Sequence, residues 1–208
     1  MTTQAQVHSA EHVHRDDLGA RLGMWLFLFT ELILFGGMFL VYSVYRFSHP
    51  QEFHIAAKEL NTIVGTFNTM ILLTSSLTMV LSIAAIQRDN KKLSIFFQFL
   101  TILLAVFFMV NKFFEWSVKF HHGIYTGSET LLNEKSGDIL FFGLYYVMTG
   151  LHGLHVLVGI VIIAVMMRFT SKGIVTHDNY IKLENTGLYW HLVDIIWIFL
   201  FPLFYLIT

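Results

Sequence analysis

The chain has 208 residues, of which 55% are hydrophobic and only 13% are charged. Soluble domains contain about 25% charged residues, so this composition predicts an integral membrane protein. A formal net charge of −1 gives no basic surface for nucleic acid. The absence of cysteine excludes disulfides, thiolate metal sites and haem attachment through cysteine.

Five segments are long and apolar enough to cross a membrane, because about 20 helical residues span a hydrocarbon layer of about 30 Å. None alternates between polar and apolar residues, so we predict helices rather than the strands of a barrel. The predicted fold class is an all-α membrane bundle of five transmembrane helices, formed by residues 21–208 after a polar tail at residues 1–20. The predicted spans are Leu22–Tyr45, Ile63–Ile86, Leu93–Trp116, Ile139–Met167 and Leu188–Ile207.

The Lys and Arg residues of the loops predict the orientation of the bundle. Eight lie in the N-terminal tail and in the second and fourth loops, and four lie in the first and third loops. The side with more positive charge is normally cytoplasmic, so we predict a cytoplasmic N-terminus and a C-terminus outside. The longest loop, "KFHHGIYTGSETLLNEKSGD", then faces the outside.

The first two spans carry different polar side chains. Glu31 lies in "MWLFLFTELILFGGMFL", nine positions after Leu22, which is about 13 Å into the layer at 1.5 Å per residue. A carboxylate at that depth needs a partner or a proton. The second span is rich in hydroxyls, which we expect mainly to bond back to the preceding turn, with contact to Glu31 as the alternative. Its polar residues are Asn68, Thr69, Thr74, Ser75, Ser76 and Thr78.

The third span ends with an i,i+3 pair of opposite charges, Lys112 and Glu115. We interpret this pair as side chains that snorkel to the membrane interface. The alternative is contact with a lipid headgroup or a partner subunit. Trp190, near the start of the last span, is a third candidate for such a contact.

The fourth and fifth spans each carry an ionisable i,i+3 pair, His152 with His155 and His191 with Asp194. Each pair shares one helix face. Because an Asp at a helix centre is costly, by about 2.5–3.5 kcal/mol on insertion scales, these groups need a reason to be there. We expect them to form a buried polar network with Glu31 that fixes how the helices pack.

Other interpretations of these residues stay open. The group could act as a proton relay, or bind a metal or haem between helices. The sequence has no EXXH or HEXXH pattern, and we predict no catalytic, cofactor-binding or metal-binding residues in this chain. Two further classes of function are a stand-alone membrane metal or haem protein built on the histidines, and a proton-coupled transporter using Glu31 and Asp194.

Four motifs in the same order resemble the subunit III family of cytochrome c oxidase. They are the Glu-bearing "WLFLFTELILFGG", the hydroxyl-rich "NTMILLTSSLTM", the Gly-His "TGLHGLHVLVG" and the terminal "GLYWHLVDIIWIFLF". The resemblance covers nearly the whole chain after about residue 20. It is to the five-helix form of the family, which lacks the first two helices of the longer members.

The resemblance implies a non-redox subunit that packs on subunit I and supports stable turnover and proton uptake. It places the haem and copper in partner subunits I and II, and implies bound phospholipid and a multi-pass location in the bacterial plasma membrane. Longer members hold lipid against the two helices that this chain lacks. "ENTGLYWH" and Glu31 resemble the branch that takes electrons from cytochrome c, and the ubiquinol oxidases of the same family are the alternative.

Overall fold

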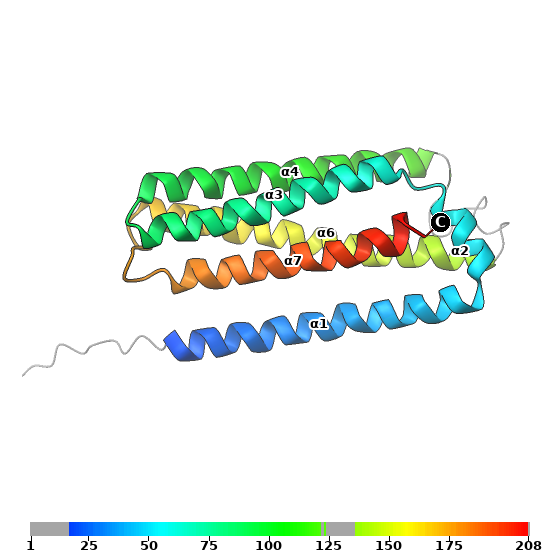
Figure 1. Cartoon of the computed structure of the whole chain (residues 1–208), viewed down its shortest axis with the longest axis horizontal. Helices are drawn as coiled ribbons and strands as arrows, with labels where there is room; N and C mark the ends of the chain where they lie inside the picture. The colour runs from blue at the N-terminus through cyan, green and yellow to red at the C-terminus, as the bar shows by residue number, and fades with distance from the viewer. Residues whose placement is uncertain (1–16, 122, 124–135, 208) are drawn as a thin grey trace, which may run out of the picture.

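The computed structural model describes residues 17–121, 123 and 136–207, and this part of the chain folds into helices (Figure 1). Their bounds are α1 Asp17–Ser48, α2 Pro50–Ala57, α3 Thr62–Gln87, α4 Lys91–His121, α6 Ser136–Ser171 and α7 Ile181–Tyr205. All except α2 are long and apolar enough to span a membrane, which makes five candidate spans. The prediction of a five-helix transmembrane fold is therefore confirmed.

The helices extend beyond the predicted apolar spans. For example, α4 begins at Lys91 and ends at His121, whereas the predicted span ran from Leu93 to Trp116. Helix α1 begins at Asp17, inside the predicted polar tail, most of which lies outside the described residues. Hydropathy marks only the part of a helix that lies in hydrocarbon, whereas the backbone hydrogen bonds continue into the more polar flanks. Most of the long third loop also lies outside the described residues.

The short helix α2 was not predicted from the sequence. Its eight residues begin with Pro50, whose fixed φ suits the first turn of a helix. The helix is held by Phe53, which is fully buried and packs edge-to-face against Tyr42 of α1 and Phe141 of α6. A segment this short carries too little periodicity to be recognised before its tertiary contacts are known.

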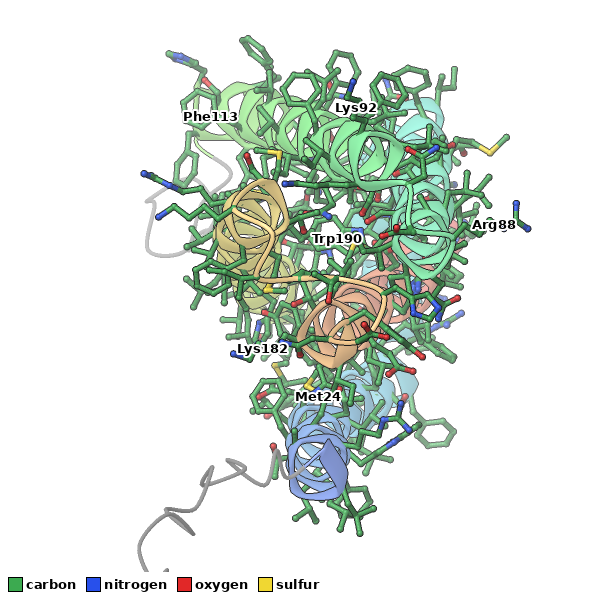
Figure 2. All side chains as sticks on the ribbon, turned by 90° about the vertical axis from the view of Figure 1, so that its left-hand side faces the viewer. Met24, Arg88, Lys92, Phe113, Lys182 and Trp190 are labelled. Atoms are coloured by element: carbon green, nitrogen blue, oxygen red, sulfur yellow. The ribbon has the colours of Figure 1, made fainter. Side chains whose placement is uncertain are left out.

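Four helices, α3, α4, α6 and α7, enclose a common core, and α1 packs against α6 and α7 from outside (Figures 1 and 2). Figure 2 looks along the helices from the predicted cytoplasmic end and shows Trp190 inside the four-helix core. The apolar window of α7 is 56% buried and that of α1 only 11%, so α7 is the central helix and α1 the peripheral one. Large apolar side chains such as Leu26 and Phe113 point outward, as expected for a surface that faces lipid.

Helices α6 and α7 approach each other closely at Gly159. A Cβ atom added to Gly159 would lie 2.6 Å from Cζ3 of Trp190. Several other glycines are less crowded, since a Cβ on Gly143, Gly36 or Gly37 would meet nothing within 4 Å. Trp190 cannot easily move aside, because it is fully buried and its Nε1 donates to Ser75 Oγ at 3.1 Å.

We predict that Gly159→Ala destabilises the protein and that Gly143→Ala in the same helix does not. Overpacking at Gly159 should destabilise the fold by about 1–3 kcal/mol, which outweighs the gain of about 1 kcal/mol in helix propensity. The measurement is the thermal unfolding midpoint of each purified variant in detergent. Equal midpoints for the two variants would contradict the close packing of Trp190 on Gly159.

Candidate functional site

Glu31 of α1 and His155 of α6 form an ion pair or hydrogen bond in the membrane-spanning part of the bundle. The distance from His155 Nε2 to Glu31 Oε2 is 2.9 Å, and both side chains are mostly buried. The other ring nitrogen, Nδ1, lies 2.8 Å from the carbonyl oxygen of Leu151. Phe35 packs edge-on against the imidazole at 5.4 Å, and Tyr189 donates to the carbonyl of His155 at 3.0 Å.

This geometry restricts where the proton of the pair can be. A carbonyl oxygen only accepts, so Nδ1 of His155 carries a hydrogen. Nε2 then either accepts from a protonated Glu31 or donates, as imidazolium, to a carboxylate. In both forms the pair holds one proton between its two atoms and has no net charge. The proton can therefore shift between the two residues without placing a net charge in hydrocarbon.

The Glu31–His155 pair lines a cavity of about 370 Å³ between α1, α6 and α7. The cavity walls are mainly apolar side chains such as Met24, Phe27 and Ile162. Arg21 and Glu184 form an exposed salt bridge of 2.9 Å between α1 and α7, nearer the predicted cytoplasmic end. The cavity is thus an apolar recess with a polar pair in its wall.

His191 belongs to a row of contacts between α7 and the hydroxyls of α3. Its Nδ1 lies 2.6 Å from Ser76 Oγ. Trp190 Nε1 donates to Ser75 Oγ, and Trp197 Nε1 donates to Thr69 Oγ1, each at 3.1 Å. Several α3 hydroxyls also bond back to the preceding turn, as predicted, and none of these bonds involves Glu31.

His152 is buried, and neither of its ring nitrogens has a hydrogen-bond partner among the described residues. The Asp194 carboxyl group is buried as well and lies beside the Ser76 hydroxyl. The His152 ring packs against Phe108 at 5.8 Å and Trp197 at 5.3 Å. Of the five predicted network residues, the structure joins Glu31 to His155 directly. It connects His191 to Ser76, whose hydroxyl also lies beside Asp194, and within the described part of the chain no hydrogen bond links these contacts to His152.

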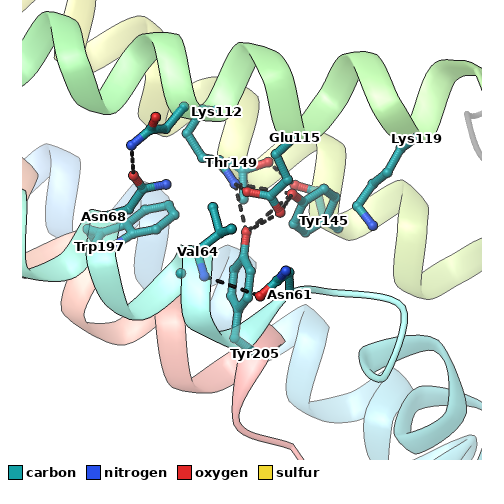
Figure 3. Close-up of polar contacts among 12 residues, drawn as sticks. Asn61, Val64, Asn68, Lys112, Glu115, Lys119, Tyr145, Thr149, Trp197 and Tyr205 are labelled. Carbon is teal, nitrogen blue, oxygen red and sulfur yellow. Dashed lines mark hydrogen bonds and ion pairs between the residues drawn. The ribbon is translucent and has the colours of Figure 1, made fainter.

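The densest polar cluster lies nearer the predicted outer end, where α4, α6 and α7 meet (Figure 3). Lys112 Nζ donates to Glu115 Oε2 at 3.1 Å, to the Tyr145 hydroxyl at 3.1 Å and to the Tyr205 hydroxyl at 2.8 Å. Both tyrosine hydroxyls also lie within bonding distance of Glu115 Oε1, at 2.7 and 2.5 Å. The ammonium lies 5.1 Å from the centre of the Trp197 ring, which favours a cation–π contact.

Lys112 and Glu115 are buried within the bundle, whereas the sequence favours an interpretation as interfacial side chains. Each is only 8% exposed, because the two tyrosines supply the hydrogen bonds that water would give at the interface. Trp190 is fully buried as well, so in this chain it faces α3 and α6 rather than lipid. Tyr145 and Tyr205 were not recognised from the sequence, since an aromatic residue in an apolar helix gives no polar signal.

Lys119, one helical turn beyond Glu115, connects the cluster to the loop before α3. Its Nζ donates to the carbonyl oxygen of Glu59 at 3.0 Å. Within residues 17–121, 123 and 136–207, no three His, Asp or Glu side chains are grouped as metal ligands would be. The chemistry that this arrangement supports is therefore pairing of charges and protons between helices.

Comparison with known proteins agrees with the four motifs. The family model for cytochrome c oxidase subunit III matches residues 2–208. The chain belongs to the cytochrome c oxidase subunit III family. This assignment extends over all five candidate spans and all the polar contacts described above.

Curated relatives include members of several oxidase types. "Cytochrome c oxidase subunit 3" of Thermostichus vulcanus is 30% identical over 99% of this chain and 96% of its own length. "Probable quinol oxidase subunit 3" of Staphylococcus saprophyticus is 29% identical over 90% of this chain and 88% of its own. "Heme-copper oxidase subunit I+III" of Aeropyrum pernix is 29% identical over 90% of this chain, which corresponds to 22% of that longer protein.

We predict that Lys112→Met destabilises the protein by about 3–5 kcal/mol, because it leaves the Glu115 carboxylate buried without its cation. Replacing both charges, with Lys112→Met and Glu115→Gln together, should restore much of this stability. Lys92→Met, at an exposed position of the same helix, should change stability by less than about 0.5 kcal/mol. Denaturant unfolding of the purified chain tests all three. A double variant less stable than Lys112→Met would contradict mutual compensation of the two charges.

Proposed function

We propose that this chain is the non-redox subunit III of a proton-pumping cytochrome c oxidase, and that it packs on subunit I. The observation that carries the proposal is the match to the subunit III family over residues 2–208. The haem and copper then belong to subunits I and II, and the chain has no catalytic centre of its own. Its titratable side chains support this role, because Glu31 bonds to His155 and Lys112 to Glu115.

Subunit I is proposed as the direct partner for two reasons. The relative from Aeropyrum pernix is named as a single protein that combines subunits I and III. Fusion is compatible only with two units that remain in the same membrane complex. The exposed apolar surface of this chain is also large enough to be shared between a partner and lipid, since many large side chains on every spanning helix point outward.

Support of turnover and proton uptake is proposed for the Glu31–His155 pair. The pair shares one proton without net charge and lines a recess between α1, α6 and α7. It belongs to the half of the bundle that we predict to face the cytoplasm, from which an oxidase takes up protons. The apolar walls of the recess suit a phospholipid chain, and basic residues of the neighbouring loops suit its headgroup. We place the complex in the bacterial plasma membrane.

We predict that Glu31→Ala leaves the initial rate of oxygen consumption unchanged but makes the rate decay over successive turnovers, with subunit III still bound. The rate of a Glu31→Gln complex should decay similarly, because the amide can hydrogen-bond to His155 but, unlike a carboxyl group, cannot take up or release a proton. Glu184→Ala, which breaks an exposed salt bridge, is the matched control and should behave as the unmodified protein. Constant activity of a fully assembled Glu31→Ala complex would contradict a role in turnover.

We propose cytochrome c as the electron donor, because the motif "ENTGLYWH" and Glu31 resemble the branch of the family that uses it. Identities of 30% to a cytochrome c oxidase subunit and 29% to a quinol oxidase subunit do not separate the two branches. We predict that the purified complex consumes oxygen faster with reduced cytochrome c than with a ubiquinol. Faster turnover with the quinol would assign the complex to the other branch and leave the subunit III assignment intact.

A further inference from the structure

A cavity of about 350 Å³ lies between α3 and α4 at the predicted outer end of the bundle. This volume is within the range of about 300–1,000 Å³ that is usual for small-ligand sites. The cavity straddles the ends of two predicted spans, which begin at Ile63 and end at Trp116, so it lies at the depth of lipid headgroups. Its lining residues are Glu59, Asn61, Val64, Asn111, Phe114, Glu115, Val118 and Lys119.

Lys119 supplies a positive charge to the wall of this cavity. Its side chain is only 7% exposed and reaches from α4 toward the turn before α3 (Figure 3), where Nζ donates to the carbonyl oxygen of Glu59 at 3.0 Å. An ammonium group has three N–H donors, and this carbonyl is its one acceptor among the residues that the structure describes. Because a buried cation needs its donors satisfied, Lys119 favours an anionic ligand group.

Glu59 supplies the negative charge that is left for a ligand. Its side chain is exposed, and its carboxylate forms no ion pair within residues 17–121, 123 and 136–207. The other carboxylate in the wall, Glu115, is neutralised by Lys112 at 3.1 Å. The N-terminus of α3 is already capped, since Asn61 Oδ1 accepts from two backbone N–H groups. The cavity therefore offers one cation and one anion to a ligand.

An apolar surface continues from the cavity toward the middle of the membrane. Phe67 follows Val64 by three positions on α3, and Phe107 precedes Phe114 by seven on α4, so both lie on the helix faces that line the cavity. Their rings meet edge-to-face at 6.2 Å and are 54% and 48% exposed. A ligand that occupies both regions has a charged head and apolar chains.

We propose that this cavity binds the headgroup of a zwitterionic phospholipid of the phosphatidylethanolamine class. The phosphate accepts from Lys119 Nζ, the ammonium donates to the Glu59 carboxylate, and the acyl chains pack on Phe67 and Phe107. An anionic phospholipid such as phosphatidylglycerol would satisfy Lys119 but leave Glu59 without a cation, so the two charges together select the zwitterion. The site is separate from the recess between α1, α6 and α7 and does not depend on which oxidase the chain belongs to.

Photo-crosslinking in nanodiscs tests the site. The full-length chain is reconstituted in equal parts of phosphatidylethanolamine, phosphatidylglycerol and a galactosyl diacylglycerol, which has no phosphate. A diazirine amino acid at Phe114 samples the cavity, and one at Phe113 samples lipid at the same depth on another face of α4; these positions are 63% and 72% exposed. Adducts formed on irradiation are identified by mass spectrometry. We expect the ratio of phosphatidylethanolamine to phosphatidylglycerol adducts to be about two- to fivefold higher at Phe114 than at Phe113. Equal ratios would mean that only bulk lipid covers this face and would overturn the proposal.

A variant of Glu59 tests the selection of the zwitterion without disturbing a buried group. Glu59→Gln should lower the ratio at Phe114 to that at Phe113, because a neutral amide does not attract the ammonium. Lys58→Met removes one charge at the adjacent exposed position, outside the cavity, and should leave the ratio at Phe114 high. An unchanged ratio in Glu59→Gln, or loss of the preference in both variants, would overturn selection by Glu59.

Variants of Lys119 test the phosphate contact. Lys119→Met should lower the ratio of phospholipid to galactolipid adducts at Phe114 about tenfold, with no change at Phe113. Lys119→Arg keeps the charge and the donors and should restore most of the ratio. The same ratio in Lys119→Met as in the unmodified chain would show that Lys119 does not bind the phosphate and would overturn the site.

Discussion

Hydrocarbon supplies no hydrogen-bond partners, and this constraint explains most of the polar architecture of the bundle. Most polar side chains on the spanning helices find partners on another helix or on the preceding turn. The contact between α3 and α7 satisfies this requirement repeatedly, since Thr69, Ser75 and Ser76 each meet a ring nitrogen of α7. These bonds fix the rotation of both helices about their axes. Apolar packing alone would allow several rotations, because lipid and leucine are equally apolar.

The Lys112–Glu115 cluster applies the same constraint to charges. A buried ion pair stabilises a fold little by itself, because desolvation offsets the attraction of the two charges. Here Lys112 has three acceptors and Glu115 accepts from both tyrosines, so the geometry is highly directional. The cluster therefore specifies how α4, α6 and α7 meet. A rotation of any of the three helices would break the hydrogen bonds between the charged pair of α4 and the tyrosines of α6 and α7.

The sequence allowed prediction of the membrane-spanning helices, but of few hydrogen-bond partners between them. Length and hydropathy identify a transmembrane helix because the bilayer imposes both. Spacing also showed correctly which side chains share a face, as with His191 and Asp194. Spacing could not show which helix faces contact each other. Glu31 and its partner His155 are separated by 124 positions, and Lys112 and Tyr205 by 93. For the same reason the burial of Lys112 was not predicted, because the tyrosines that enclose it come from other helices.

The distance in sequence between Glu31 and His155 has a consequence for biosynthesis. Helix α1 emerges first, and the ribosome must add a further 124 residues before the partner of Glu31 exists. At about 5–20 residues per second this takes roughly 6–25 s. During that interval the carboxyl group must be protonated, remain near the interface or be sheltered by the insertion machinery. Helix α1 therefore packs against the rest of the bundle late in biogenesis, after α6 has been inserted.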